Sequence, residues 1–254
     1  MDIVNIQEIC SMKIIPLKEG NFSASKTKDF TLLTEENFDT IPGIKMSVQP
    51  FLIITENDYI LLDAGIGWKN ALGKTIMSEI LEKENIRPEQ ITKLLLSHLH
   101  KDHIEGAVKY TADGYEATFP NAEIYIQKRE LDFAMEKKGN PSFDFDILEK
   151  LIQLPNIIWM NEDKGQITNE ISYEVVGGHT PFMQVFWIKE NEETAFYGAD
   201  DLPQASYLKY HLAYKSDFNG KKAMELRLLW EKEARENNWQ ILLYHDLDKA
   251  IIKV

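Results

Sequence analysis

The sequence predicts a four-layer α/β sandwich in which two packed β-sheets lie between outer helices. Short β-rich runs occupy both halves of the 254-residue chain, and segments with helical periodicity lie between them. Strand-rich blocks in both halves, each with an amphipathic helix to cover it, favour two sheets that pack against each other. A doubly wound α/β sheet fits the same periodicity nearly as well, so the pattern of strands and helices leaves both folds open.

The expected strands are short runs of apolar and β-branched residues. In the N-terminal half they cover 12–17, 51–55, 59–63, 93–97 and 123–126. The three residues 56–58 between the second and third runs predict a hairpin-like connection. In the C-terminal half the expected strands cover 172–176, 185–189, 194–197, 241–244 and 250–254.

Four segments are expected to be helical. Apolar residues recur at helical spacing at Leu72, Ile76, Met77, Ile80 and Leu81. The same spacing joins Ala223, Leu226, Trp230 and Ala234. Weaker patterns predict helices over 128–137 and 144–151.

The polar segment 18–46 lacks either periodicity and is expected to be a long loop. Long loops in compact domains are often lids, and a disordered connection is the alternative. Its aromatic residues Phe22, Phe30 and Phe38 would give an apolar wall for an acyl or alkyl group.

Composition limits the partners and the compartment. The chain has 28 basic and 41 acidic side chains, and a net charge of −13 argues against binding duplex nucleic acid or an anionic membrane. Its one cysteine, Cys10, cannot close an intrachain disulfide and is expected to be structural. The first residues lack a cationic signal region, and no apolar run approaches the roughly 20 residues that span a bilayer. We therefore expect one cytoplasmic domain, 1–254, with a homodimer left open.

The strongest motif is His-x-His-x-Asp-His at residues 98–103, directly after an apolar run. In an extended stretch His98 and His100 project to the same side and can converge on one ion. If the chain then turns into a helix, Asp102 and His103 can point to a second position. Imidazole and carboxylate are ligands of Zn²⁺, Mn²⁺ and Fe²⁺. A solvated histidine-rich loop without metal is the alternative.

Three further ligand candidates close apolar strands. They are His179 after Gly177-Gly178, Asp200 after Gly198-Ala199, and His245 after Tyr244. Polar side chains at the ends of rigid strands suit a metal site. Taken singly each could be an ordinary loop residue, but beside the 98–103 motif they are expected to be ligands.

Two more aspartates adjoin these motifs. Asp63, in the turn Asp63-Ala64-Gly65, is expected to fix that turn, with orientation of a ligand histidine as the alternative. Asp201, next to Asp200, is expected to be a solvated neighbour.

These motifs resemble those of the metallo-β-lactamase fold hydrolases. The resemblance includes Gly106 after the histidine motif and the Asp63–Gly65 turn, and it extends over about residues 50–246. It implies an αβ/βα sandwich with its site at the sheet edges and two divalent metal ions, expected to be Zn²⁺. One ion would be held by His98, His100 and His179. The other would be held by Asp102, His103 and His245, with Asp200 and a hydroxide as bridges.

Within this family the chain resembles the branch of N-acyl-homoserine lactone lactonases and organophosphate hydrolases. The resemblance lies in residues 119–125 and in the helical run before residues 242–246. Flavodiiron proteins have Glu where this chain has His100, which argues against iron redox chemistry. Some lactonases have a tyrosine three residues after the bridging aspartate, where this chain has Pro203. The candidates for lining the substrate pocket are therefore Tyr207, Tyr210 and His211.

The expected function is hydrolysis of a small lactone or ester by a hydroxide that bridges two metal ions. Asp102 and Asp200 are the expected catalytic carboxylates, and Asp200 could pass a proton to the leaving alkoxide. A thioesterase or phosphotriesterase could use the same site. A metal-binding sensor or interaction module without turnover is the alternative from another class, and the complete ligand set favours the enzyme. A nuclease would share the ligands, but the negative charge and the lack of a basic stripe count against it.

Overall fold

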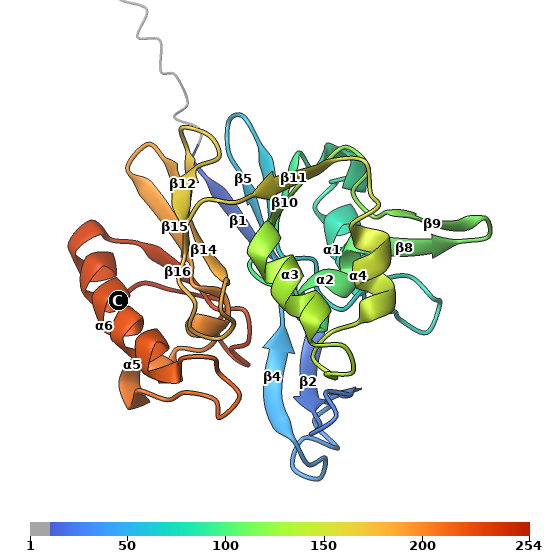
Figure 1. The fold of residues 1–254 in the computed structure, drawn as a ribbon, viewed down its shortest axis with the longest axis horizontal. Helices are drawn as coiled ribbons and strands as arrows, with labels where there is room; N and C mark the ends of the chain where they lie inside the picture. Colours follow the sequence, from blue (N-terminus) through green and yellow to red (C-terminus); the bar gives the residue numbers. More distant parts are fainter. Residues whose placement is uncertain (1–10) are drawn as a thin grey trace, which may run out of the picture.

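Two six-stranded sheets form the centre of the structure, a computed structural model that describes residues 11–254 (Figure 1). The first has the order β1-β5-β6-β7-β10-β11, with bounds Lys13–Pro16, Phe51–Ile54, Tyr59–Leu62, Lys93–Leu95, Glu123–Gln127 and Ile157–Met160. The second runs β12 to β17 in sequence order, with bounds Lys164–Gln166, Ile171–Val175, Gln184–Glu190, Glu193–Tyr197, Gln240–Leu242 and Ile251–Ile252. Cys10 lies outside the described residues.

Both sheets are mixed. In the first sheet β1, β5 and β6 pair antiparallel, whereas β6, β7, β10 and β11 pair parallel. In the second sheet only β15 and β16 pair parallel. Each parallel step needs a crossover connection, and these connections contain the main helices.

Helices cover the outer faces of both sheets (Figure 1). Those associated with the first sheet are α1 Ile76–Lys83, α2 Lys101–Ile104, α3 Lys128–Glu136 and α4 Phe145–Leu151. Those associated with the second sheet are α5 Ser206–Tyr210 and α6 Gly220–Asn237. Side chains cap the starts of four of them: Thr75 accepts the Ser78 N–H, Gln127 the Arg129 N–H, Asp144 the Ile147 N–H and Asn219 the Lys222 N–H.

The strands bury alternate residues on opposite faces, which produces four layers. On β6, Ile60 and Leu62 belong to the core shared with the second sheet, whereas Leu61 packs in the core beneath α1, α3 and α4. On β15, the Phe196 ring lies 5.0 Å from the Trp230 ring of α6, and Tyr197 lies 6.2 Å from Phe51 of the first sheet. This alternation confirms the four-layer sandwich and excludes the doubly wound alternative.

The predicted loop 18–46 is wrong. It contains β2 Gly20–Ala24, β3 Phe30–Leu32 and β4 Ile44–Val48, which form a small sheet of order β3-β2-β4. Buried polar residues weaken the alternating pattern of this segment: Ser23 is 2% exposed, and its hydroxyl donates to the Pro42 carbonyl at 2.9 Å. Phe22 is buried in the core, so it is not part of a pocket wall.

Other boundaries differ from the sequence pattern. Leu72 is 92% exposed and lies before α1, because the Thr75 cap starts that helix at Ile76. A hairpin of β8 Val108–Thr111 and β9 Gly114–Ala117 was not predicted, nor were β11 and β12. Three short 3₁₀ helices, Pro88–Gln90, Glu105–Ala107 and Ala199–Asp201, complete the chain's helical segments within the described residues.

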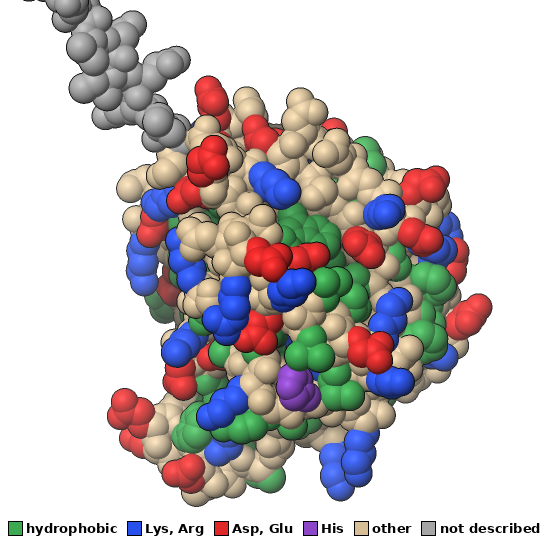
Figure 2. All heavy atoms as spheres, turned by 90° about the vertical axis from the view of Figure 1, so that its left-hand side faces the viewer, with side chains coloured by type: hydrophobic (Ala, Val, Ile, Leu, Met, Phe, Trp, Pro, Cys, Tyr) green, Lys and Arg blue, Asp and Glu red, His purple; other side chains and the backbone are tan. Residues whose placement is uncertain are grey.

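The described surface mixes charges of both signs. Figure 2 shows acidic and basic side chains interspersed over one face, with apolar patches between them. Among residues 11–254, no helix combines the length and apolar character needed to cross a bilayer.

Candidate metal centre

The seven predicted ligands meet at one end of the sandwich, on loops that follow strands of both sheets. His98 and His100 follow β7, and Asp102 and His103 lie on α2, which starts immediately after His100. From the second sheet, His179 follows β13, Asp200 follows β15 and His245 follows β16. The structure therefore brings all seven of these residues together in one place.

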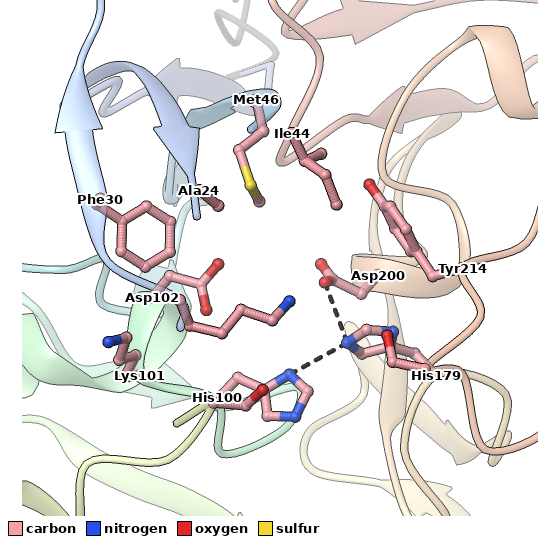
Figure 3. Close-up of a pocket in the computed structure, with 13 residues that line it drawn as sticks. Ala24, Phe30, Ile44, Met46, His100, Lys101, Asp102, His179, Asp200 and Tyr214 are labelled. Atoms are coloured by element: carbon pink, nitrogen blue, oxygen red, sulfur yellow. Dashed lines mark hydrogen bonds and ion pairs between the residues drawn. The ribbon is translucent and has the colours of Figure 1, made fainter. Parts of the chain in front are cut away.

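The first donor group contains three histidines. The Nε2 atoms of His98 and His179 each lie 3.1 Å from Nδ1 of His100. Asp200 Oδ2 lies 3.4 Å from His179 Nε2 (Figure 3). All three imidazoles can therefore direct a nitrogen at one point next to Asp200.

The second donor group lies on the other side of Asp200. Its Oδ1 atom is 3.3 Å from His103 Nε2 and 3.1 Å from His245 Nε2. Asp102 Oδ2 lies 3.8 Å from His103 Nε2 and 3.6 Å from His245 Nε2. Asp200 thus directs one oxygen at each group.

The residues fit divalent metal ions. Among the buried atoms of the described residues that have no hydrogen-bond partner, three belong to the donor groups, namely His103 Nε2, His245 Nε2 and Asp200 Oδ1. Buried polar atoms left unpaired cost free energy, and these three converge. Imidazole nitrogen and carboxylate oxygen are donors that Zn²⁺ and similar ions prefer, so a cation in each group would satisfy them.

Oxygen atoms hold the other ring nitrogens of four histidines. Nδ1 lies 2.7 Å from Asp63 Oδ2 for His103, from Asp217 Oδ1 for His179 and from the Ser47 carbonyl for His245. His98 Nδ1 lies 3.0 Å from Ser97 Oγ. Because Nδ1 donates in each case, the lone pair of Nε2 faces the centre.

Asp63 has both of the roles that the sequence left open, namely fixing its turn and orienting a ligand histidine. It is fully buried with φ of 55°, in the left-handed region that few non-glycine residues adopt. Its carboxylate also accepts bonds from the Ser97 N–H at 2.7 Å, the Ser97 hydroxyl at 2.7 Å and the Tyr197 hydroxyl at 2.5 Å, besides that from His103. Asp63 therefore fixes the turn and orients His103.

The prediction that Asp201 is a solvated neighbour is wrong. Asp201 is 1% exposed, and its Oδ1 accepts the backbone N–H of His179 at 2.6 Å. A Cβ on Gly178 would lie 2.2 Å from that oxygen, so glycine is required for this approach. Burial raises the pKa of Asp201 to about 7.

Burial and mutual repulsion keep two histidines neutral. Burial, with the neighbouring histidines, lowers the pKa of His98 and of His100 well below the usual value. Burial alone would raise the pKa of Asp200, but the charges of His245 and His103 hold it well below its usual range. Neutral His98 and His100 and the ionised Asp200 are in the protonation states that metal binding needs. Burial alone would lower the pKa of His103 and of His179, but Asp200 and neighbouring carboxylates raise it, so a metal ion would displace a proton from these two.

A pocket of about 490 Å³, open solvent included, leads to the centre. Ala24, Phe30, Ile44 and Met46 contribute apolar side chains, and Ile44 and Met46 face His100 and His179 across it (Figure 3). The rest of the lining is polar and consists of Lys28, His100, Lys101, Asp102, Ser142, His179, Asp200, Tyr214 and Ser216. The segment predicted to cover the site therefore does line it, but as a small sheet.

None of the three predicted pocket residues lines this pocket. Tyr207 is buried, with its ring 5.7 Å from that of Tyr214, while Tyr210 is 58% exposed and His211 is exposed at the end of α5. Tyr214 is the aromatic residue from this region that reaches the pocket. Neither Tyr214 nor Asp217 carries a sequence signal, because both lie in a polar stretch without periodicity.

The family model described as the metallo-beta-lactamase superfamily matches residues 45–220, which is more than half of the chain. The chain belongs to the metallo-β-lactamase superfamily. The match includes six of the seven predicted ligands, and His245 lies beyond it.

Several solved structures of hydrolases share the fold of the chain. A probable metal-dependent hydrolase from Staphylococcus aureus is 18% identical, with a TM-score of 0.75 over 97% of this chain and 93% of that one. AidC, a dizinc quorum-quenching lactonase, is 21% identical, with a TM-score of 0.69 over 96% and 90%. An N-acyl homoserine lactone hydrolase is 18% identical, with a TM-score of 0.65 over 94% of both chains. These neighbours support the resemblance to the lactonase branch at the level of the fold.

Curated protein sequences give no significant match to this metallo-β-lactamase superfamily member.

Proposed function

We propose that the chain is a binuclear metal-dependent hydrolase of ester bonds, with lactones as the first substrate class to test. The observation that carries this proposal is the position of Asp200, whose two oxygens face two separate donor groups. His98, His100 and His179 would hold one ion, Asp102, His103 and His245 the other, and Asp200 would bridge them.

Two divalent ions would supply Lewis-acid activation of water and of the scissile carbonyl group. The protein would position the substrate against this centre through the apolar side of the pocket and would exclude water there. Asp200 is ionised and lines the pocket, so its carboxylate can accept a proton from the attacking water and return it to the leaving alkoxide. Asp102 also lines the pocket and can hold the water in place.

The choice of lactones rests on the neighbours. The N-acyl homoserine lactone hydrolase is described with its product, N-hexanoyl-L-homoserine, bound at the catalytic metal centre. The apolar wall of Ala24, Phe30, Ile44 and Met46 suits an acyl chain. Thioesters and phosphotriesters could react at the same centre. A complete donor set that opens into a pocket favours an enzyme over a sensor without turnover.

Metal analysis combined with a substrate panel tests the proposal. We expect about two transition-metal equivalents per chain and loss of turnover on chelation, with recovery when metal returns. Lactones, aryl esters, thioesters, phosphotriesters and β-lactams should be assayed with one defined metal. Full activity with less than one equivalent would overturn the binuclear mechanism, and no turnover of any substrate would favour the sensor.

Asp200→Ala provides the residue-level test. We expect it to bind fewer than two equivalents and to lose most of its kcat. Asp132→Ala, at a largely exposed position on α3, is the matched control and should keep both. A nearly normal rate for Asp200→Ala would show that Asp200 is not a bridge.

A further inference from the structure

The pocket contains an ammonium group without a counter-ion. Lys28 is partly buried and lines the pocket together with His100, Asp102 and Asp200. Within the described residues it forms no salt bridge. The other lysine of the pocket, Lys101, also forms no salt bridge within the described residues, but its Nζ atom lies 5.7 Å from the centre of the Phe30 ring. Lys28 thus has neither a salt-bridge partner nor an aromatic partner among residues 11–254.

The backbone at Lys28 is strained and held by its neighbours. Its φ of 59° lies in the left-handed region, which costs a non-glycine residue about 1 kcal/mol. The Lys28 N–H donates to the Ser25 carbonyl at 3.1 Å, and the Ser25 N–H donates to the Asp29 carbonyl at 3.0 Å. The Asp29 N–H donates to Ser25 Oγ at 3.2 Å, and the Thr27 hydroxyl donates to the Asp29 carboxylate at 2.5 Å. Strain retained in a tightly bonded turn is typical of functional positions.

The two carboxylates of the pocket, Asp102 and Asp200, would be engaged by metal ions, so they would not neutralise Lys28. Apolar side chains of Ala24, Phe30, Ile44 and Met46 form one side of the pocket. Lys28 lines the same pocket as His100 and His179 of the first donor group and Asp102 of the second. Metal ions in those groups would add positive charge near Lys28. A ligand with an anionic group would neutralise an ammonium that the protein leaves unpaired.

We propose that Lys28 is a specificity-determining residue that binds a carboxylate carried by the substrate, at a distance from the bond that is cleaved. The preferred substrate is therefore an ester or lactone with a separate carboxylate, and its apolar portion packs on the wall formed by β2, β3 and β4. The cleavage of an ester at the metal centre rests on the proposed function. The binding of a separate carboxylate rests on Lys28 alone.

A matched pair of esters tests the assignment. The mono-4-nitrophenyl ester of adipic acid and 4-nitrophenyl hexanoate have acyl chains of the same length, and only the first carries a free carboxylate. For the metal-loaded protein we expect kcat/KM to favour the adipate ester by about 10-fold, mainly through KM, as one charge-assisted hydrogen bond would give. Lys28→Met should reduce this ratio to about 1, and Lys28→Arg should restore most of it.

Lys26→Met is the control because Lys26 is exposed in the same turn and does not line the pocket. It should keep the full preference for the adipate ester. Thermal unfolding of each variant checks that the turn between β2 and β3 still folds. Equal losses of kcat/KM on both esters in Lys28→Met would overturn the proposal, because Lys28 would then act on the scissile group or on the fold.

Calorimetric binding of adipate and hexanoate separates this proposal from the proposed function. Each acid has one carboxylate for the metal centre, so the difference in their affinities reports the second carboxylate. If neither ester is hydrolysed, the ester hydrolase is contradicted for these substrates, but a preference for adipate that Lys28→Met removes still supports the role of Lys28. If both esters are hydrolysed without a charge preference, the role of Lys28 is contradicted and the hydrolase stands.

Discussion

Asp217 lies outside both donor groups, yet replacing it should weaken one of them. Its side chain is 5% exposed, and its Oδ1 accepts the Nδ1–H of His179 at 2.7 Å. Its Oδ2 accepts the backbone N–H of Tyr214 at 2.8 Å. Asp217→Asn keeps the size of the side chain but supplies only one acceptor oxygen. The amide NH2 that replaces the second oxygen must then face either the His179 Nδ1–H or the Tyr214 N–H. That donor is left without an acceptor.

The expected size of the effect follows from these two bonds. Leaving one buried donor unpaired costs about 1–3 kcal/mol, and outer partners of ligand histidines typically contribute 10–100-fold to metal affinity. We expect Asp217→Asn to lower the affinity for one of two ions by about 10–100-fold and to leave the other nearly unchanged. The weakened ion is the one that His179 would hold, because His103 and His245 have different outer partners.

Competition with a chromophoric chelator can resolve the two dissociation constants. Asp132→Asn is the matched control, since this carboxylate is 59% exposed on α3. In the metal-free protein, Asp217→Asn should change the free energy of unfolding less than it changes the free energy of metal binding. If both constants of Asp217→Asn stay within twofold of the wild type, the reasoning about the His179 partner is refuted.

The structure sets the direction of three further changes in the free energy of unfolding. Each can be measured by urea unfolding of the metal-free protein. Asp63→Ala leaves buried donors of Ser97, His103 and Tyr197 without an acceptor. It should lower the free energy of unfolding by about 3–5 kcal/mol. Gly106→Ala places a Cβ 2.0 Å from the Ala64 carbonyl oxygen and should cost about 1–3 kcal/mol. Burial raises the pKa of Glu19 to about 8, so the folded state binds a proton between about pH 4.5 and 8 and stability falls as pH rises. Relative to Glu19→Gln, the wild type should lose up to about 4 kcal/mol between pH 5 and pH 8.

Each of these expectations has a clear contrary result. Wild-type stability in Asp63→Ala would mean that water satisfies the stranded donors. An unchanged unfolding midpoint in Gly106→Ala would mean that the Asp63–Gly65 turn can move away. A constant stability difference between wild type and Glu19→Gln across pH 5–8 would mean that Glu19 titrates near its usual pKa in the folded protein.

The candidate donor residues could be named from the sequence because their signals are local, whereas their division between two ions came from the family resemblance. His98, His100 and Asp102 lie within one short motif, and His179 and His245 each follow an apolar strand. A polar residue at the end of a buried strand is recognisable without knowing what the strand pairs with. The same runs left the four-layer sandwich and a doubly wound sheet open, and the resemblance to the metallo-β-lactamase fold hydrolases favoured the sandwich.

The parts that were missed depend on contacts between distant segments. The sheet of β2, β3 and β4 is stabilised by pairing between β2 and β4 and by contacts such as that of Ser47 with Tyr244. Asp201 could not be distinguished from a solvated residue, because its burial depends on the approach of Gly178. Tyr214 reaches the pocket through the irregular chain after α5, for which no periodicity exists.

The donor atoms come from both halves of the chain, and this affects more than catalysis. His98, His100 and Asp102 belong to the first sheet's side, whereas His179 and His245 follow strands of the second. Neither half carries either donor group complete, so an ion in either group would join the two sheets as a removable cross-link. Chain fragments divided between β11 and β12 would then associate more tightly with metal than without it, and loss of metal in the intact protein would loosen the contact between the sheets.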